Sequence, residues 1–136
     1  LLEEARLITG GKIITVFGCG GDRDRTKRPK MGAVASDLSD FVVITSDNSR
    51  IEEPSEIIKD IIKWIKKDNY IIEPDRAKAI KKAVSIAKTG DTLLIAGKGH
   101  ENYQEIKGIR YPFSDKEVFK KTIQNASRIS RDKMQN

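Results

Sequence analysis

The chain has 136 residues, a net charge of +6 and one cysteine, and 34% of its residues are charged. This length suits one domain, and a lone cysteine excludes an internal disulfide, which is typical of a cytoplasmic protein. No stretch is long enough to span a membrane, and with 6% aromatic residues and lysines spread along helical segments we expect no nucleic acid partner.

Residues 1–11 have the pattern of a helix end and a linker. The apolar residues of Leu1–Ile8 have helical spacing, and a glycine pair follows them. We expect this segment to come from an upstream domain. One α/β domain is then predicted at 12–130, followed by a frayed polar tail at 131–136.

Short apolar runs and helical stripes alternate along the rest of the chain. The predicted strands are 12–17, 41–45, 70–73 and 92–96, with a β-hairpin at 103–113, and the predicted helices are 31–38, 54–65, 75–87 and 114–129. Continuous apolar strands indicate burial on both faces. The pattern predicts an α/β fold with a doubly wound, mostly parallel, Rossmann-like sheet and an edge β-hairpin near the C-terminus.

The apolar positions of the helices predict which faces are buried. We expect the following to face the core: Met31, Val34, Ala35 and Leu38 in the first helix, Ile57, Ile58, Ile61, Ile62 and Ile65 in the second, and Ala77, Ile80, Val84 and Ala87 in the third. Asp75 is a predicted helix cap, and Ser114 with Glu117 forms a predicted capping box.

A glycine-rich turn follows the first strand. Gly18, Gly20 and Gly21 allow close backbone approach to a ligand, and the next helix would direct free N–H groups at an anion. The third glycine of a dinucleotide fingerprint and the Gly-Lys-Ser/Thr of a P-loop are both absent. An anion site and a solvated charged turn therefore remain equally supported. Cys19 is interpreted as a small turn residue rather than a nucleophile, because no local cysteine signature surrounds it.

Polar loops follow the strands at 18–28, 47–50 and 97–101. In a doubly wound sheet, ligands bind outside the carboxyl ends of the strands, so these loops are expected to converge. Arg23 and Arg50 offer planar guanidinium groups to a carboxylate. Asn48 can donate and accept, and Glu101 can hold an ammonium group. Together these side chains predict a clamp for an amino acid.

Each of these residues also has a plainer interpretation. Arg50 could form a surface salt bridge with Glu52 or Glu53, and Glu101 could be a solvated loop acid. Lys27 and Lys98 are expected either to meet phosphate or to be solvated. His100 is interpreted as structural rather than as a proton-transfer group. No His/Cys cluster has metal-ligand spacing, so no metal site is predicted in this chain.

The same loops carry a family resemblance over nearly the whole chain. The motifs are Val-Phe-Gly-Cys-Gly-Gly-Asp-Arg-Asp with Lys-Arg-Pro-Lys-Met-Gly, Thr-Ser-Asp-Asn-Ser-Arg with Glu-Glu-Pro, and Ala-Gly-Lys-Gly-His-Glu-Asn-Tyr-Gln. In this order and spacing, they resemble the C-terminal domain of the Mur ligases, in the MurE branch that adds a diamino acid.

The resemblance implies an ATP-dependent cytoplasmic amide ligase of peptidoglycan synthesis. Its substrates would be a diamino acid, UDP-MurNAc-L-Ala-D-Glu and ATP, and the D-Glu γ-carboxylate would react through an acyl phosphate. ATP and Mg²⁺ would be bound mainly by a central domain that this chain lacks. The chain would then be a mobile lid, inactive alone, in a monomeric protein that does not bind membranes.

The resemblance also implies residue roles. The residues matching diamino-acid positions are Arg23, Asp47, Asn48, Arg50, Gly97 and Glu101, and those matching the nucleotide-proximal loop are Asp22, Asp24 and Lys27. The arginine kept at Arg50 favours meso-diaminopimelate, with lysine or lanthionine as alternatives because Ser49 replaces the family's proline. A non-catalytic nucleotide- or anion-binding module and the lid of a folylpolyglutamate synthetase-like ligase remain the alternative functions.

Overall fold

The computed structural model describes residues 10–98 and 101–135, with side chains up to residue 126. The predicted helix end at Leu1–Ile8 and the loop residue His100 lie outside the described residues.

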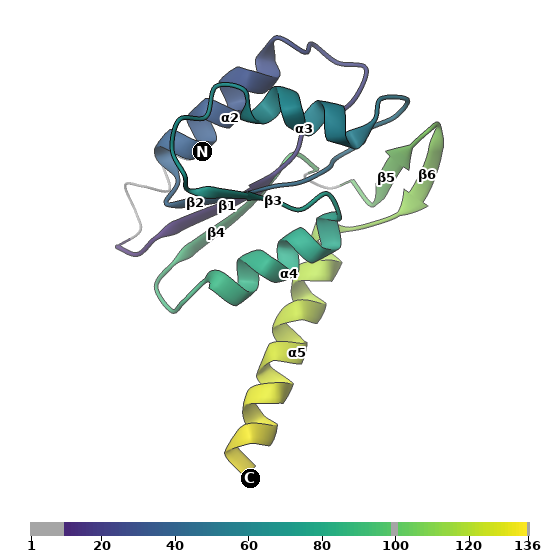
Figure 1. Ribbon diagram of the computed structural model, residues 1–136. Coiled ribbons are helices and arrows are strands. Elements are labelled where there is room, and N and C mark those ends of the chain that lie inside the picture. Colours follow the sequence, from purple (N-terminus) through teal and green to yellow (C-terminus); the bar gives the residue numbers. More distant parts are fainter. Residues whose placement is uncertain (1–9, 99–100, 136) are drawn as a thin grey trace.

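A parallel sheet with helices on both faces forms the body of the molecule. The elements are β1 (Ile13–Phe17), α2 (Lys27–Leu38), β2 (Phe41–Ile44), α3 (Pro54–Ile62), β3 (Tyr70–Ile72), α4 (Arg76–Ile86), β4 (Thr92–Ala96), β5 (Tyr103–Ile106), β6 (Ile109–Pro112) and α5 (Asp115–Gln135). The 4-stranded sheet has the order β3-β2-β1-β4, with α2 and α3 on one face and α4 and α5 on the other (Figure 1). The predicted doubly wound α/β fold is confirmed.

The predicted hairpin is also present, and it makes a sheet of its own. Strands β5 and β6 pair antiparallel, next to the edge where the parallel strands end (Figure 1). An isolated β-bridge between Arg50 and Ile106 helps to join the hairpin to the loop after β2. The hairpin is therefore fixed to a predicted binding loop rather than to the sheet.

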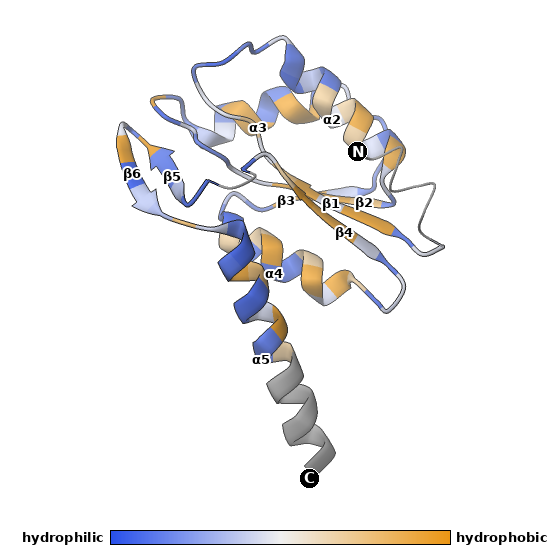
Figure 2. Cartoon of the chain, turned by 180° about the vertical axis from the view of Figure 1, so that it is seen from behind, coloured by the Kyte–Doolittle hydropathy of each residue, from blue (hydrophilic) through white to orange (hydrophobic). Residues whose placement is uncertain are grey.

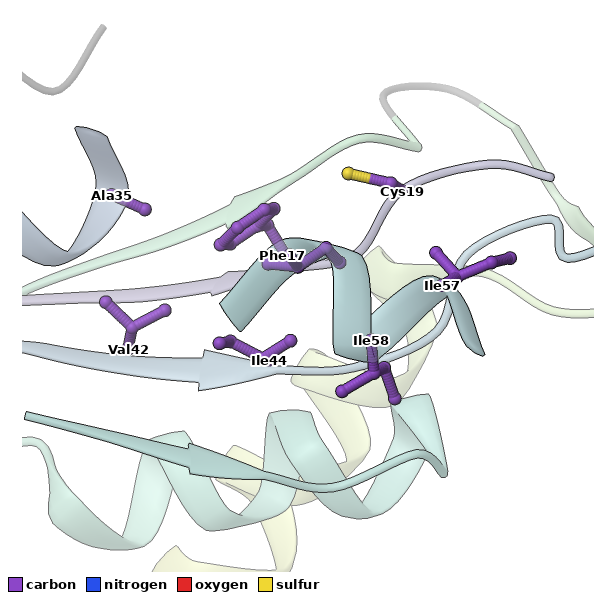
Figure 3. Packing of buried hydrophobic residues seen from close by; sticks show 8 residues of the cluster. Phe17, Cys19, Ala35, Val42, Ile44, Ile57 and Ile58 are labelled. Carbon is purple, nitrogen blue, oxygen red and sulfur yellow. The ribbon is translucent and has the colours of Figure 1, made fainter. Parts of the chain in front are cut away.

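The core has a layer on each face of the sheet, because successive strand residues point to opposite faces. The strands of the parallel sheet are the most hydrophobic part of the chain, whereas the hairpin is more polar (Figure 2). On one face, Phe17, Val42 and Ile44 pack with the α3 isoleucines 57, 58 and 61 (Figure 3). The other layer consists of Ile14, Val16, Val43, Ala79, Ile80 and Ala83.

Helix α2 differs from its prediction in both start and orientation. It begins at Lys27, before the predicted start. The helix tolerates Pro29 in its first turn, because an N–H group there would have no helical hydrogen-bond partner. A Cβ at Gly32 would overlap the carbonyl oxygen of Ile61, so α2 packs on α3 through this glycine. That contact turns Met31 and Val34 outward, to 46% and 52% exposure. The prediction that they face the core is wrong.

Instead, the outward-turned side chains of α2 line an apolar groove. Its volume is about 470 Å³, and its lining includes Met31, Val34 and Leu38 of α2 and Leu94 of β4. The groove lies over β1 and β4, on the part of the sheet face that α2 and α3 leave uncovered.

The other helices follow their predictions more closely. In α3, the isoleucine stripe is buried or packed against the core. Asp75 caps α4 by accepting from the Lys78 N–H at 3.1 Å. In α4 the buried apolar residues are Ala79, Ile80 and Ala83. The buried face of this helix is therefore rotated by about one residue from the predicted face. Helix α5 extends to Gln135, so the segment predicted as a frayed tail is helical.

Candidate functional site

The strand order brings the predicted binding loops together. Strand β1 lies between β2 and β4, so the loops after these three strands start side by side. The chain leaves β1 towards α2 on one face and reaches β4 from α4 on the other. This makes the gap between β1 and β4 the topological switch point, where ligands bind in such sheets.

Asn48 lies at the centre of this loop cluster and is 4% exposed. Its Oδ1 accepts from Lys98 Nζ at 3.0 Å and from the Glu105 backbone N–H at 2.9 Å. Its Nδ2 donates to Glu101 Oε2 at 3.0 Å. The amide oxygen is therefore used within the protein, and one N–H of the amide remains for a ligand.

Lys98 is buried and its ammonium group is paired within the protein, so the interpretation of it as a solvated residue is wrong, while a contact with phosphate stays a prediction. Its side chain is 0% exposed, and Nζ lies 3.0 Å from Asp47 Oδ1. Nζ also donates to the Tyr103 carbonyl at 2.8 Å and lies 3.8 Å from Glu101 Oε2. Lys98 thus neutralises Asp47 and orients Asn48. No pattern in the sequence distinguishes this lysine from a surface one.

Arg50 has left-handed backbone geometry, with φ of +54°, and contacts both the hairpin and the glycine-rich turn. Its N–H donates to the Glu105 carbonyl at 3.0 Å. Nη1 donates to the Gly21 carbonyl at 2.8 Å, and Nε lies 3.7 Å from Glu105 Oε2. The expected alternative, a salt bridge to Glu52 or Glu53, is replaced by this pairing with Glu105.

The glycine-rich turn packs against the loop after β2. A Cβ at Gly21 would overlap the carbonyl oxygen of Ser49, and the Gly21 N–H donates to the Asn48 carbonyl at 2.7 Å. A Cβ at Gly20 would lie 2.9 Å from Arg50 Nη1. In this structure the glycines allow two loops of the protein to approach each other, rather than a phosphate.

The remaining predicted residues lie around this centre. Gly97 is next to Asp47, because its Cβ position would be 3.0 Å from Asp47 Oδ2. Arg23 is exposed, with its side-chain stem near Gly20 and therefore near Arg50. The structure thus brings together the whole predicted diamino-acid set, with Arg23 at its outer rim.

The predicted nucleotide-proximal residues are all exposed and lie outside this centre. Asp24 accepts from the backbone and hydroxyl of Thr26, at 3.0 and 2.6 Å, and so stabilises the start of α2. The Asp22 N–H donates to Glu52 Oε1 at 2.8 Å. Lys27 is the first residue of α2.

Arg28, 1% exposed, holds the glycine-rich turn in place. The sequence pattern did not predict this role. Its guanidinium donates to Glu52 at 2.9 and 3.0 Å, to Asp60 at 3.0 Å and to the Gly20 carbonyl at 3.0 Å. Hydrogen bonds from Arg28 and from the Asp22 N–H lower the pKa of Glu52 from 4.5 to about 2. The same carboxylates raise the pKa of Arg28.

Arg76, also 1% exposed, holds the loops after β2 and β4 in place. It forms a bidentate ion pair with Asp115 at 2.7 and 2.8 Å. It also donates to the carbonyl of Ser46, just after β2, at 3.1 Å and to that of Ala96, the last residue of β4, at 3.0 Å. This buried pair fixes the distance between the loops that carry Asn48 and Lys98.

Cys19 is buried, and this agrees with its interpretation as a structural residue. It is 8% exposed and belongs to the hydrophobic layer under α3 (Figure 3). Burial raises the pKa of its thiol from 9.0 to about 11. A protonated thiol in an apolar layer is a poor nucleophile.

Among the described residues, no three His, Cys, Asp or Glu side chains gather in a way that could hold a metal ion. None of the helices in that part of the chain is long and apolar enough to cross a bilayer.

The comparisons with known proteins fit this geometry. Residues 1–99 match the family model described as Mur ligase, glutamate ligase domain. The chain belongs to the Mur ligase family. The match includes the turn after β1, the loop after β2 and the start of the loop after β4, so the clustered loops belong to the family domain.

Individual relatives agree with this assignment. A UDP-N-acetylmuramoyl-L-alanyl-D-glutamate--2,6-diaminopimelate ligase from Aquifex aeolicus is 55% identical over 97% of this chain, which spans 28% of that protein. The enzyme of the same name from Clostridium tetani is 54% identical over 91% of the chain and 26% of its own length. A solved structure of a ligase with this name has a TM-score of 0.88 and 41% identity, over 93% of this Mur ligase domain and 26% of the solved chain.

Proposed function

We propose that this Mur ligase domain is the lid of an ATP-dependent amide ligase that adds a diamino acid to UDP-MurNAc-L-Ala-D-Glu. The γ-carboxylate of D-Glu is activated as an acyl phosphate, and an amine of the diamino acid attacks it in the cytoplasm during peptidoglycan synthesis. The domain holds the incoming amino acid and closes over the rest of the protein. The observation that carries this proposal is the cluster of Asp47, Asn48, Arg50 and Glu101 at the switch point.

Each group of the site has a role in holding the diamino acid, with meso-diaminopimelate preferred. Arg50 and Arg23 bind the distal carboxylate, and the free N–H of Asn48 orients it. Glu101 receives the distal ammonium group, and Asp47 and Gly97 complete the wall beside it. Lysine carries an amine but no carboxylate at that end, so it leaves the two guanidinium groups without a ligand partner.

The contribution of this domain to ATP binding is small and local. Lys27 places an exposed ammonium group in the first turn of α2, where the helix dipole also favours an anion, and this fits a phosphate. Asp22 and Asp24 lie in the loop just before α2 and would approach the nucleotide on closure. Bound ATP supplies the phosphoryl group that activates the carboxylate. We assign Mg²⁺ mainly to the rest of the protein, as the family resemblance implies.

The test is a competition assay on the full-length protein that contains this domain. Wild type is expected to use meso-diaminopimelate in preference to lysine, and Arg50→Ala to lose diaminopimelate far more than lysine. Loss of one charge-assisted hydrogen bond costs about 1.5–3 kcal/mol, which is about 10- to 100-fold in this ratio. Exposed Arg25→Ala is the matched control. A wild type that prefers lysine, or an Arg50→Ala variant with an unchanged ratio, would refute the proposal.

A further inference from the structure

One carboxylate in the site is unexplained by the proposed function. Glu105 lies in β5, next to the clamp, and its side chain is 22% exposed, as is that of Arg50. Its backbone N–H donates to Asn48 Oδ1 at 2.9 Å, and its carbonyl accepts from the Arg50 N–H at 3.0 Å. These backbone contacts fix the position of Glu105 whatever its side chain is.

The Glu105 carboxylate is shared between two arginines. Oε2 lies 3.7 Å from Arg50 Nε, and Oε1 accepts from Arg110 Nε at 3.4 Å. Arg110 is in turn held over the Tyr103 ring, 4.3 Å from its centroid. At 3.7 Å the pairing with Arg50 is beyond hydrogen-bond distance. Glu105 therefore compensates the positive charge of Arg50 but leaves the Nε–H group of Arg50 free of a hydrogen bond to it.

The remaining contacts of Arg50 show where a substrate carboxylate would approach. Nη1 is occupied by the carbonyls of Gly21 and Asn48, at 2.8 and 3.3 Å. A carboxylate that binds a guanidinium bidentately therefore has to use the Nε and Nη2 side, which is the side that Glu105 faces. Two carboxylates would then lie on the same edge of one guanidinium and repel each other.

We propose that Glu105 is a specificity-determining residue, the internal counter-ion of Arg50, which weakens the preference of the site for a diamino acid with a second carboxylate. This inference rests on the proposed function. Glu105 neutralises Arg50 when the distal end of the substrate is uncharged or cationic, so lysine is penalised less than it would be by a bare guanidinium. The distal carboxylate of diaminopimelate has to displace Glu105 towards Arg110.

The experiment measures kcat/KM for meso-diaminopimelate and for lysine in the full-length protein. Glu105→Gln keeps the shape and the backbone contacts, and is expected to raise the diaminopimelate-to-lysine ratio about tenfold, equivalent to about 1.4 kcal/mol. Arg110→Gln frees Glu105 to move onto Arg50 and is expected to lower the ratio. Both changes should be larger at low ionic strength, because the pair is partly exposed.

Controls separate this effect from general charge and from folding. Glu56→Gln removes the same charge from an exposed pair with Lys59 and is expected to leave the ratio unchanged. In an Arg50→Ala background, Glu105→Gln should change the ratio less than it does in wild type, because the part of its effect that depends on pairing with Arg50 is then absent. Melting temperatures close to wild type would show that the variants are folded.

The outcomes also distinguish the inference from the function on which it rests. A wild type that uses diaminopimelate, with an unchanged or lowered ratio in Glu105→Gln, overturns the inference alone; a lowered ratio would make Glu105 a ligand of the substrate ammonium group. A wild type that accepts neither amino acid overturns both.

Discussion

The ammonium group of Lys98 lies 3.0 Å from the side-chain oxygen of Asn48, and this contact decides which way the Asn48 amide faces. With Oδ1 held by Lys98, Nδ2 has to point at Glu101. Lys98 also neutralises Asp47, so one buried cation sets both the charge and the hydrogen-bond directions of the loop cluster.

We expect Lys98→Met to destabilise the domain strongly. The substitution leaves the Asp47 carboxylate buried without its cation, and breaking such a pair costs about 3–5 kcal/mol. Urea unfolding of the purified 136-residue chain measures this. Lys59→Met removes an exposed lysine and should cost less than about 1 kcal/mol. The double variant Asp47→Asn/Lys98→Met should recover much of the loss, and a double variant as unstable as Lys98→Met would contradict this account.

Ser49 and Ser36 make a matched pair for testing a buried hydroxyl, because each is 1% exposed. Among the described residues, the Ser49 hydroxyl has no hydrogen-bond partner, whereas that of Ser36 donates to Asn69 Oδ1 at 2.7 Å. Ser49→Ala should therefore be neutral or stabilising by up to about 1 kcal/mol, and Ser36→Ala should destabilise by about 1 kcal/mol or more. Equal losses of unfolding free energy in the two variants would show that Ser49 has a partner after all.

Stability should fall in acid through Glu52. The pKa of this carboxyl is lowered from 4.5 to about 2, so its contribution to stability is complete above 4.5 and is lost as the pH falls towards 2. Unfolding free energies measured across this range should decrease, and less steeply for Glu52→Gln than for wild type. Glu56→Gln, which changes an exposed residue of α3, should keep the wild-type slope. Identical slopes for wild type and Glu52→Gln would argue against the Arg28 pairing in solution.

Cys19 should resist thiol reagents in the folded domain. Its thiolate is the reactive form, and burial raises the thiol pKa to about 11. With a disulfide reagent near neutral pH, we expect a slow reaction in buffer and a fast one in urea. A fast reaction in buffer would mean that the layer under α3 opens easily or that the thiol is more acidic than its surroundings indicate.

The fold and the convergence of the three polar loops were predictable, because both follow from local patterns and topology. Buried strands between helices predicted the parallel sheet, and the strand order then placed the loops with Asn48, Arg50 and Glu101 together. A charged or amide side chain just after a buried strand can be recognised in the sequence as a candidate binding residue, because ligands bind at the carboxyl ends of such strands.

The partners within the site were not predictable, because they depend on contacts between distant segments. Lys98, Arg28 and Arg76 look like surface residues in the sequence, and only the packing of the loops shows that they are buried. The prediction of which face of α2 is buried was wrong for a similar reason. Its apolar stripe predicts a buried face, but the close contact at Gly32 decides which face meets α3.

The wide sequence separation of Asn48 and Lys98, 50 residues, also has a consequence for synthesis. At about 5–20 residues per second, a ribosome completes Asn48 about 3–10 s before Lys98. Until β4 has emerged and added to the sheet beside β1, the Asp47 carboxylate has no cation and has to stay hydrated. The binding loops therefore cannot be completed during translation of the first half of this chain, and the clamp is assembled after the sheet that supports it.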